Sequence, residues 1–178
     1  MKELPVRKGI RLKGYNYSSS GYYFVTVCVK DKHEMLGKVV VGDAVHSVTP
    51  HTKLSEYGLV VKRILEMGGD ARIQLDRYIV MPNHIHMILI VSHDEKRDVR
   101  MASPTREKRD AVDSVPYTKS LVSTFVRSFK TMTTKQIGFS LWQRSFHDRI
   151  IRNEDEYQRI WQYIDENPLH WAEDDYFV

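Results

Sequence analysis

The pattern of apolar and polar positions predicts strands first and a helix after them. Residues 21–30 (GYYFVTVCVK) are rich in aromatic and β-branched side chains, which favour a strand. One face of this strand carries Tyr23, Val25, Val27 and Val29. Residues 36–48 hold Gly42-Asp43 between two valine-rich pieces, which predicts a short β-hairpin. Residues 52–67 repeat apolar side chains at helical spacing and are predicted to form a helix.

Two further strands are predicted at residues 72–80 and 83–91, on either side of Met81-Pro82. Proline cannot donate to a strand ladder, so it marks an edge, a bulge or a tight connection. Successive side chains of a strand point to opposite faces, and residues 83–91 are apolar on both. This strand is therefore predicted to lie in the centre of a sheet.

The second half of the chain begins with a charged segment. Residues 92–116 contain few large apolar side chains, which predicts a mobile surface loop. Helical periodicity returns over residues 117–136. The apolar stripe of this helix consists of Leu121, Val122, Phe125, Phe129 and Met132.

A third helix is predicted over residues 153–167. Asn153, with Glu156 three residues later, forms a start that resembles a capping box. Pro168 ends the helix, because proline disfavours helical geometry in the residue before it. The buried face of this helix is predicted to hold Tyr157, Ile160, Trp161 and Ile164.

This order of elements predicts the fold class. Strands mixed with helices, without regular alternation, favour an α+β fold with a mainly antiparallel central sheet and helices packed on it. The 178 residues suit one domain over residues 1–178. A basic N-terminal arm over residues 1–20 precedes the first strand.

Composition narrows the function classes only modestly. A net charge of +4 and a pI of about 9.1 permit a nucleic-acid partner without demanding one. Cys28 is the only cysteine, so the chain can form neither an intrachain disulfide nor a thiolate metal cluster. No apolar run approaches the roughly 20 residues that cross a bilayer, and residues 1–10 lack an apolar signal-peptide core. We therefore expect a cytoplasmic protein.

The sharpest chemical feature is the pair His84 and His86 in the predicted central strand. Because they are two residues apart, both imidazoles point to the same side of the sheet. Two imidazoles held side by side make a natural pair of metal ligands. The alternative is two structural histidines, each hydrogen-bonded to a backbone carbonyl.

The third helix offers partners for this pair. Tyr163 and Asn167 are four residues apart and lie on one helix face together with Arg159. A tyrosine and an amide oxygen on one face could present a nucleophile and a third ligand to one metal-bound phosphate. The alternatives are a packing tyrosine with its hydroxyl at the surface and an asparagine that caps the helix.

The segment over residues 141–149 (LWQRSFHDR) concentrates aromatic and charged side chains. Trp142 and Phe146 are candidate core residues. Four nearby side chains are candidate phosphate contacts: Arg144, His147, Arg149 and Arg152. A solvated loop is the alternative interpretation of this segment.

Three blocks of sequence share their order and spacing with a known family. They are RLKGYNY at 11–17 with GYYFVT at 21–26, YIVMPNHIH at 78–86, and LWQRSFHD at 141–148 with IRN at 151–153, WQYI at 161–164 and NP at 167–168. Together they resemble the REP-associated tyrosine transposases, a branch of the single-tyrosine HUH transposases. The resemblance covers nearly the whole chain apart from residues 92–116.

The resemblance implies a ferredoxin-like fold and a set of roles. His84 and His86 would bind a divalent ion, Mg²⁺ or Mn²⁺, with Asn167 as the third ligand. Tyr163 would attack a single-stranded DNA that carries a hairpin or palindromic repeat, forming a covalent 5′-phosphotyrosine. Ligand softness alone would favour Zn²⁺ or Mn²⁺ for two imidazoles, so Mg²⁺ rests on the family.

DNA contacts are expected from three basic regions: the N-terminal arm, the second helix and the segment before the third helix. The candidates are Lys8, Arg11, Lys13, Arg127, Lys130, Arg144, Arg149 and Arg152. The protein is expected to act as a monomer or a homodimer. Two other functions stay open, namely a hairpin-binding regulator with weak or lost cleavage and a phosphodiesterase that uses a water nucleophile.

Overall fold

The computed structural model describes residues 20–41, 49–68, 71–92 and 120–177. Its centre is a four-stranded sheet in which every neighbouring pair of strands is antiparallel. In spatial order the strands are β4 (Ile73–Val80), β5 (His84–Val91), β1 (Gly21–Cys28) and β6 (His147–Ile151). The prediction that the strand with the two histidines is central is confirmed, because β5 pairs on both sides.

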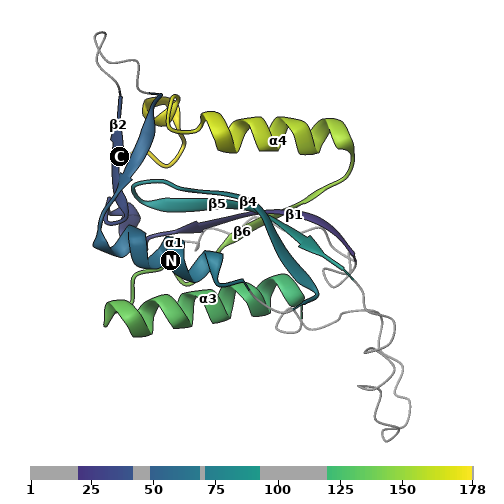
Figure 1. The fold of residues 1–178 in the computed structure, drawn as a ribbon, viewed down its shortest axis with the longest axis horizontal. Helices are drawn as coiled ribbons and strands as arrows, with labels where there is room; N and C mark the ends of the chain where they lie inside the picture. Colours follow the sequence, from purple (N-terminus) through teal and green to yellow (C-terminus); the bar gives the residue numbers. More distant parts are fainter. Residues whose placement is uncertain (1–19, 42–48, 69–70, 93–119, 178) are drawn as a thin grey trace, which may run out of the picture.

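Helices cover both faces of the sheet (Figure 1). Helix α1 (Glu56–Glu66) lies between β1 and β4 in the chain, and α3 (Leu121–Ile137) lies between β5 and β6. These two helices contact each other below the sheet, whereas α4 (Glu154–Glu166) lies above it (Figure 1). The core order is therefore βαββαβ, which confirms the predicted α+β, ferredoxin-like arrangement.

The predicted hairpin is present with a different second strand. β2 (Gly37–Val40) pairs with β3 (His51–Leu54), so residues 52–54 belong to a strand and not to the predicted helix. Helix α1 begins later because the Ser55 side chain accepts a hydrogen bond from the Gly58 amide, 3.1 Å away. A Cβ on Gly58 would lie 2.0 Å from the Leu36 carbonyl oxygen, so only glycine allows this close approach. The predicted turn at Gly42-Asp43 falls outside the described residues.

The segment before α4 contains a strand that periodicity did not reveal. Residues 147–151 form β6, which pairs with β1 at the edge of the sheet as described. Trp142 is buried, and its indole nitrogen donates to the Thr133 hydroxyl at 2.6 Å. Phe146 packs partly buried against the same core. Trp142 and Phe146 are thus core residues, and the solvated-loop interpretation of this segment is wrong.

Alternation along the strands divides the interior into two cores. The larger core lies between the sheet and α1 with α3. It includes all four residues predicted to share a face, Tyr23, Val25 and Val27 in β1 and Val29 just after it. The smaller core lies under α4 and consists of Ile88, Ile151, Ile160 and Ile164, with Phe24, Ile79, Tyr157 and Trp161 at its margin. The predicted buried face of α4 is therefore confirmed.

The predicted start of α4 is confirmed, whereas the predicted buried stripe of α3 is only partly correct. The Asn153 side chain accepts from the Glu156 amide at 2.8 Å, which confirms the predicted start of α4. The buried stripe of α3 is rotated from the predicted one, because Val126 and Thr133 are buried whereas Met132 is 37% exposed.

Within the described ranges, no helix is long and apolar enough to cross a membrane. The basic arm and the loop over residues 92–116 fall outside the described residues, apart from Ser20 and Ser92 at their ends.

Candidate metal and nucleophile site

Two buried imidazoles face each other at the start of β5. His84 and His86 are essentially inaccessible to solvent, and their Nε2 atoms lie 2.9 Å apart. Both side chains point to the α4 face, because the residues between and beyond them, Ile85 and Met87, belong to the core on the other face. The pairing with β1 sets Thr26 beside His86 and Cys28 beside His84.

Side-chain partners fix the orientation of each ring. His84 Nδ1 lies 2.9 Å from Asn83 Oδ1, and His86 Nδ1 lies 2.8 Å from the Thr26 hydroxyl. The Asn83 amide nitrogen donates to the carbonyls of Lys32 and Tyr176, so its oxygen must accept from His84. His84 therefore carries its hydrogen on Nδ1 and presents a lone pair at Nε2. Both rings are thus held by side chains and not by the backbone carbonyls that the alternative supposed.

Burial keeps both imidazoles neutral. Desolvation lowers the pKa of His84 to about 4, although the charge of Asp174 acts in the opposite direction. Desolvation, followed by the neighbouring His84, lowers the pKa of His86 well below its ordinary value. Near pH 7 both rings are therefore in the neutral form that binds cations.

The hydroxyl of Tyr163 reaches this pair from α4. It lies 3.3 Å from His86 Nε2 and donates to Asp174 Oδ2 at 3.2 Å. Tyr163 is 43% exposed, so a substrate can approach the hydroxyl from solvent. Burial of part of the ring and the charge of Asp174 raise the pKa of Tyr163, so the phenol is protonated in this arrangement.

Asp174 completes the cluster, and the sequence analysis missed it. It follows the short turn η3 (Trp171–Glu173), which brings the end of the described chain back to β5. Ligand atoms of His84, His86 and Asp174 all lie within 4.8 Å of one another. This combination of two imidazoles and one carboxylate suits a divalent ion.

Asn167, the third ligand that the resemblance implied, contacts the cluster through Asp174. Its backbone is right-handed helical, and its amide nitrogen donates to Asp174 Oδ2 at 2.8 Å rather than to the helix end. The residue is 2% exposed, and among the described residues its Oδ1 has no hydrogen-bond partner. A buried carbonyl oxygen without a partner is costly, so this atom fits a ligand for a cation beside the histidines.

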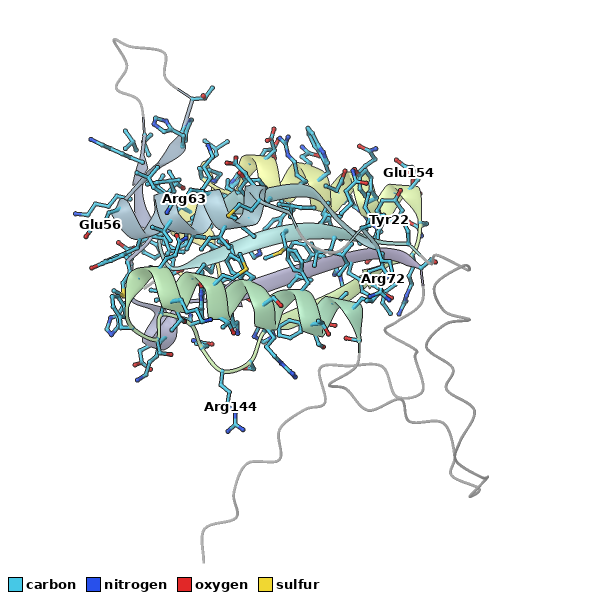
Figure 2. All side chains as sticks on the ribbon, turned by 60° about the horizontal axis from the view of Figure 1, so that its bottom comes forward. Tyr22, Glu56, Arg63, Arg72, Arg144 and Glu154 are labelled. Carbon is cyan, nitrogen blue, oxygen red and sulfur yellow. The ribbon has the colours of Figure 1, made fainter. Side chains whose placement is uncertain are left out.

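The predicted DNA contacts divide between the two faces of the sheet. Arg149 lines a groove beside Tyr163 and pairs with Glu156 at 3.4 Å, and Arg152 is exposed just before α4. Arg127 and Arg144 line a different groove along α3, and Figure 2 shows Arg144 extending away from the sheet.

Lys130 also lines the α3 groove, but its ammonium group is used internally. It donates to the carbonyls of Gln143 and Ser145 at 2.7 and 2.9 Å. Burial lowers its pKa to about 8. The side chain therefore holds the segment after α3 in place. The basic-arm candidates Lys8, Arg11 and Lys13 lie outside the described residues.

Comparison with known proteins gives one relative in sequence. A Haemophilus influenzae protein is 31% identical to this chain over 179 residues, which cover 97% of this chain and 93% of the relative. This chain belongs to the same family as the Haemophilus protein. That relative is described only as an uncharacterized protein, so the family brings no activity with it. The sequence matches no protein-family profile.

Comparison in structure gives the same fold as the sequence resemblance. The structure of a REP-associated tyrosine transposase bound to a REP hairpin matches with a TM-score of 0.53 over 91% of this chain and 75% of the transposase chain. The two sequences are 18% identical, so this match establishes the fold. This chain thus combines a transposase-like fold with a cluster of His84, His86 and Asp174 that could hold a metal ion.

Proposed function

We propose that this protein is a metal-dependent, single-stranded DNA endonuclease and strand transferase in which Tyr163 is the nucleophile. One observation carries the proposal. The Tyr163 hydroxyl lies 3.3 Å from His86 Nε2 and 3.2 Å from Asp174 Oδ2, at the edge of a cluster suited to a divalent ion. A phenol in this place can attack a phosphodiester that is bound at the cluster.

The proposed ligands are His84 Nε2, His86 Nε2, a carboxylate oxygen of Asp174 and Oδ1 of Asn167. The two oxygen ligands make the site harder than the histidines alone, which favours Mn²⁺ or Mg²⁺. When bound, such an ion polarises the scissile phosphate and neutralises charge that develops on its oxygens. Asn83 and Thr26 keep the two imidazoles aimed at it.

The reaction of Tyr163 is a transesterification. The phenolic oxygen forms a bond to phosphorus while the bond from phosphorus to the 3′-oxygen breaks. Asp174 Oδ2 already accepts the phenolic hydrogen, so it is the atom placed to take the proton. The leaving 3′-oxygen takes a proton from solvent water, so the products are a 5′-phosphotyrosine and a free 3′-hydroxyl. A second DNA 3′-hydroxyl can reverse the step without another energy source.

The substrate class rests on the fold match. The similar transposase structure contains a REP hairpin. By this analogy we propose single-stranded DNA with a hairpin or palindromic repeat as the substrate of the present protein. Arg149, which lines the groove beside Tyr163, and Arg152, which is exposed just before α4, are proposed backbone contacts.

A denaturing gel tests this function. The protein is incubated with Mn²⁺ and a labelled hairpin oligonucleotide, and a covalent band of reduced mobility is expected. Tyr163→Phe should remove the band. Tyr157→Phe is the matched control, because the Tyr157 hydroxyl donates to Asp76 at 2.7 Å, away from the cluster. Tyr176→Phe is a second control, since the Tyr176 ring centroid lies 4.5 Å from that of His84.

The same gel separates the two alternatives. A hairpin-binding regulator would bind the oligonucleotide without any covalent or cleaved product. This alternative has one observation in its favour, because the phenol that should attack has a raised pKa and already donates to Asp174. A phosphodiesterase with a water nucleophile would release cleaved DNA in a Tyr163→Phe variant as well as in the wild type.

A further inference from the structure

Arg159 stands one helical turn before Tyr163 on α4. The residues 159, 163 and 167 are spaced by four, so Arg159, Tyr163 and Asn167 form one stripe along the helix. Four residues advance an α-helix by about 6 Å, so Arg159 stands one turn farther than Tyr163 from Asn167 and the metal cluster. The stripe therefore orders three chemical groups: a cation, a phenol and an amide oxygen.

Two grooves meet at this stripe. The larger has a volume of about 740 Å³ and is lined by Phe24, His147 and Arg149 on the sheet side. The smaller has a volume of about 380 Å³ and lies toward Gln162 and the end of α4. Arg159 and Tyr163 line both grooves. A single strand of DNA that runs from one groove to the other past Tyr163 would therefore also pass Arg159.

The charge of Arg159 is available for a ligand. Its Nε donates to the backbone carbonyl of Asp155 at 3.2 Å, and among the described residues no carboxylate forms an ion pair with it. Two other arginines beside α4 differ, because Arg77 pairs with Asp165 and Arg149 pairs with Glu156, whereas Arg152 precedes the helix and lines neither groove. An exposed arginine fork without a carboxylate partner suits bidentate contact with a phosphate.

The larger groove places an aromatic ring in the same lining as Arg159. Phe24 lies along it, with its ring centroid 5.2 Å from that of His86 and 6.1 Å from that of Tyr163. Arg149 and Arg159 line this groove together with carboxylates, and since Glu156 pairs with Arg149, Arg159 is the cation of the lining for which no ion pair is found among the described residues. Aromatic platforms with cations beside them bind unpaired bases and their phosphates together, whereas a duplex hides its base faces.

We propose that Arg159 binds the DNA phosphate at the junction of the two grooves, and that the adjoining nucleotide lies in the larger groove with its base against Phe24. This proposal rests on the proposed function for the identity of the ligand as single-stranded DNA. Arg159 thereby positions the backbone so that the next phosphate meets the Tyr163 hydroxyl.

Binding measurements without chemistry test the proposal. All proteins carry Tyr163→Phe, so no covalent product can form, and the buffer contains a chelator. The probe is a labelled hairpin oligonucleotide with single-stranded flanks, titrated at several salt concentrations. Arg159→Gln should reduce the slope of log affinity against log salt by about 0.7, which corresponds to roughly fivefold weaker binding at 0.1 M salt. Arg159→Lys should keep the slope, because the charge remains.

The matched control is Arg63→Gln. Arg63 lies on α1, where its guanidinium donates to Gln136 at 2.7 Å, and Figure 2 shows it far from the start of α4 at Glu154. This variant loses the same charge and should keep the parent slope. Phe24→Leu should weaken binding several-fold without changing the slope, because base stacking carries no net charge.

The outcomes separate this proposal from the proposed function. An Arg159→Gln slope equal to that of the parent, or an equal reduction in Arg63→Gln, would overturn the assignment of Arg159. An unchanged affinity in Phe24→Leu would overturn the placement of the base. Neither result depends on whether the wild-type protein forms a covalent adduct, whose absence would instead overturn the function of Tyr163.

Discussion

The two faces of the central sheet use the same strands for different purposes. Toward α1 and α3, β5 presents Ile85, Met87 and Leu89 to a continuous apolar core. Toward α4, the same strand presents His84 and His86, and the apolar core on that side is small. The face that holds the candidate site is therefore supported by an apolar core on the opposite face of the same strands.

This division explains how buried polar groups are tolerated. Each site side chain depends on another polar group: His84 on Asn83, His86 on Thr26, and Asn167 on Asp174. A face built in this way is sensitive to loss of a partner, whereas an apolar face is sensitive to loss of volume. The following substitutions should affect the two faces differently.

The largest effect is expected from the histidines. His84→Ala and His86→Ala should each weaken Mn²⁺ binding by more than about 100-fold, since a direct ligand counts for more than the 10- to 100-fold of an outer partner. DNA binding should change little, because it draws on many phosphate contacts. Titration calorimetry measures the Mn²⁺ affinity. Equal affinity in a His84→Ala, His86→Ala double variant and in the wild type would refute the metal site.

Substitutions on the opposite face of the sheet should lower the stability of the protein and leave its metal affinity unchanged. Met87→Ala removes a fully buried side chain beside His86 and should cost roughly 2–5 kcal/mol of unfolding free energy. Mn²⁺ affinity should stay near the wild-type value at temperatures where the variant is folded. Met132→Ala is the matched control, since Met132 is partly exposed, and it should cost less than about 1 kcal/mol. Urea unfolding gives both numbers, and similar losses for the two methionines would contradict the described core.

Substitutions of Asn167 distinguish a role as a metal ligand from a purely structural role. Asn167→Ala should lower Mn²⁺ affinity and the cleavage rate by roughly 10- to 100-fold with little change in melting temperature. Asn167→Asp should retain some Mn²⁺-dependent cleavage, because a carboxylate can still bind the ion. Gln162→Ala, an exposed neighbour on α4, is the control. Early melting of Asn167→Ala with a wild-type rate would leave Asn167 a purely structural role.

Acid should lower the unfolding free energy of the metal-free protein, because the same two histidines take up protons more readily in the unfolded chain. Burial lowers the pKa of His84 to about 4 and that of His86 below its ordinary value. Between about pH 6.5 and pH 4 the unfolded chain therefore binds protons that the folded protein excludes, and stability falls as pH falls. The loss is at most about 1.4 kcal/mol per pH unit for each histidine.

Urea unfolding at pH 7.5, 6 and 5 in the presence of a chelator measures this slope. A His84→Gln, His86→Gln double variant should show a shallower dependence on pH than the wild type. Equal slopes in both proteins would mean that other groups govern the acid response.

Much of this site was predictable because it follows local periodicities. The alternation of a strand sets His84 and His86 on one side, and the helical spacing of four residues sets Tyr163 above Asn167. The central position of β5 followed from apolar residues on both its faces. The proximity of the two pairs was implied only by the family resemblance, since no local pattern relates β5 to α4.

The parts that sequence analysis missed depend on tertiary contacts. Asp174 reaches the site only because the chain turns after α4 and returns to β5, and its sequence context is one acidic residue among several. Strand β6 is a short edge strand of five residues with charged side chains, so it lacks a clear alternating pattern. The start of α1 was misplaced because Leu54, the apolar residue of β3, also fits the helical stripe.

The most direct test of the central claim is to locate the covalent bond. After reaction with Mn²⁺ and hairpin DNA, nuclease digestion leaves a nucleotide on the attacking residue, and peptide mass spectrometry finds it. Cleavage after Arg159 separates Tyr157 from Tyr163, and cleavage after Glu166 separates Tyr163 from Tyr176. The account predicts a nucleotide on the peptide over residues 160–166 with Mn²⁺ and none with a chelator. A nucleotide on the peptide that contains Tyr157 or Tyr176, or cleaved DNA without any modified tyrosine, would contradict it.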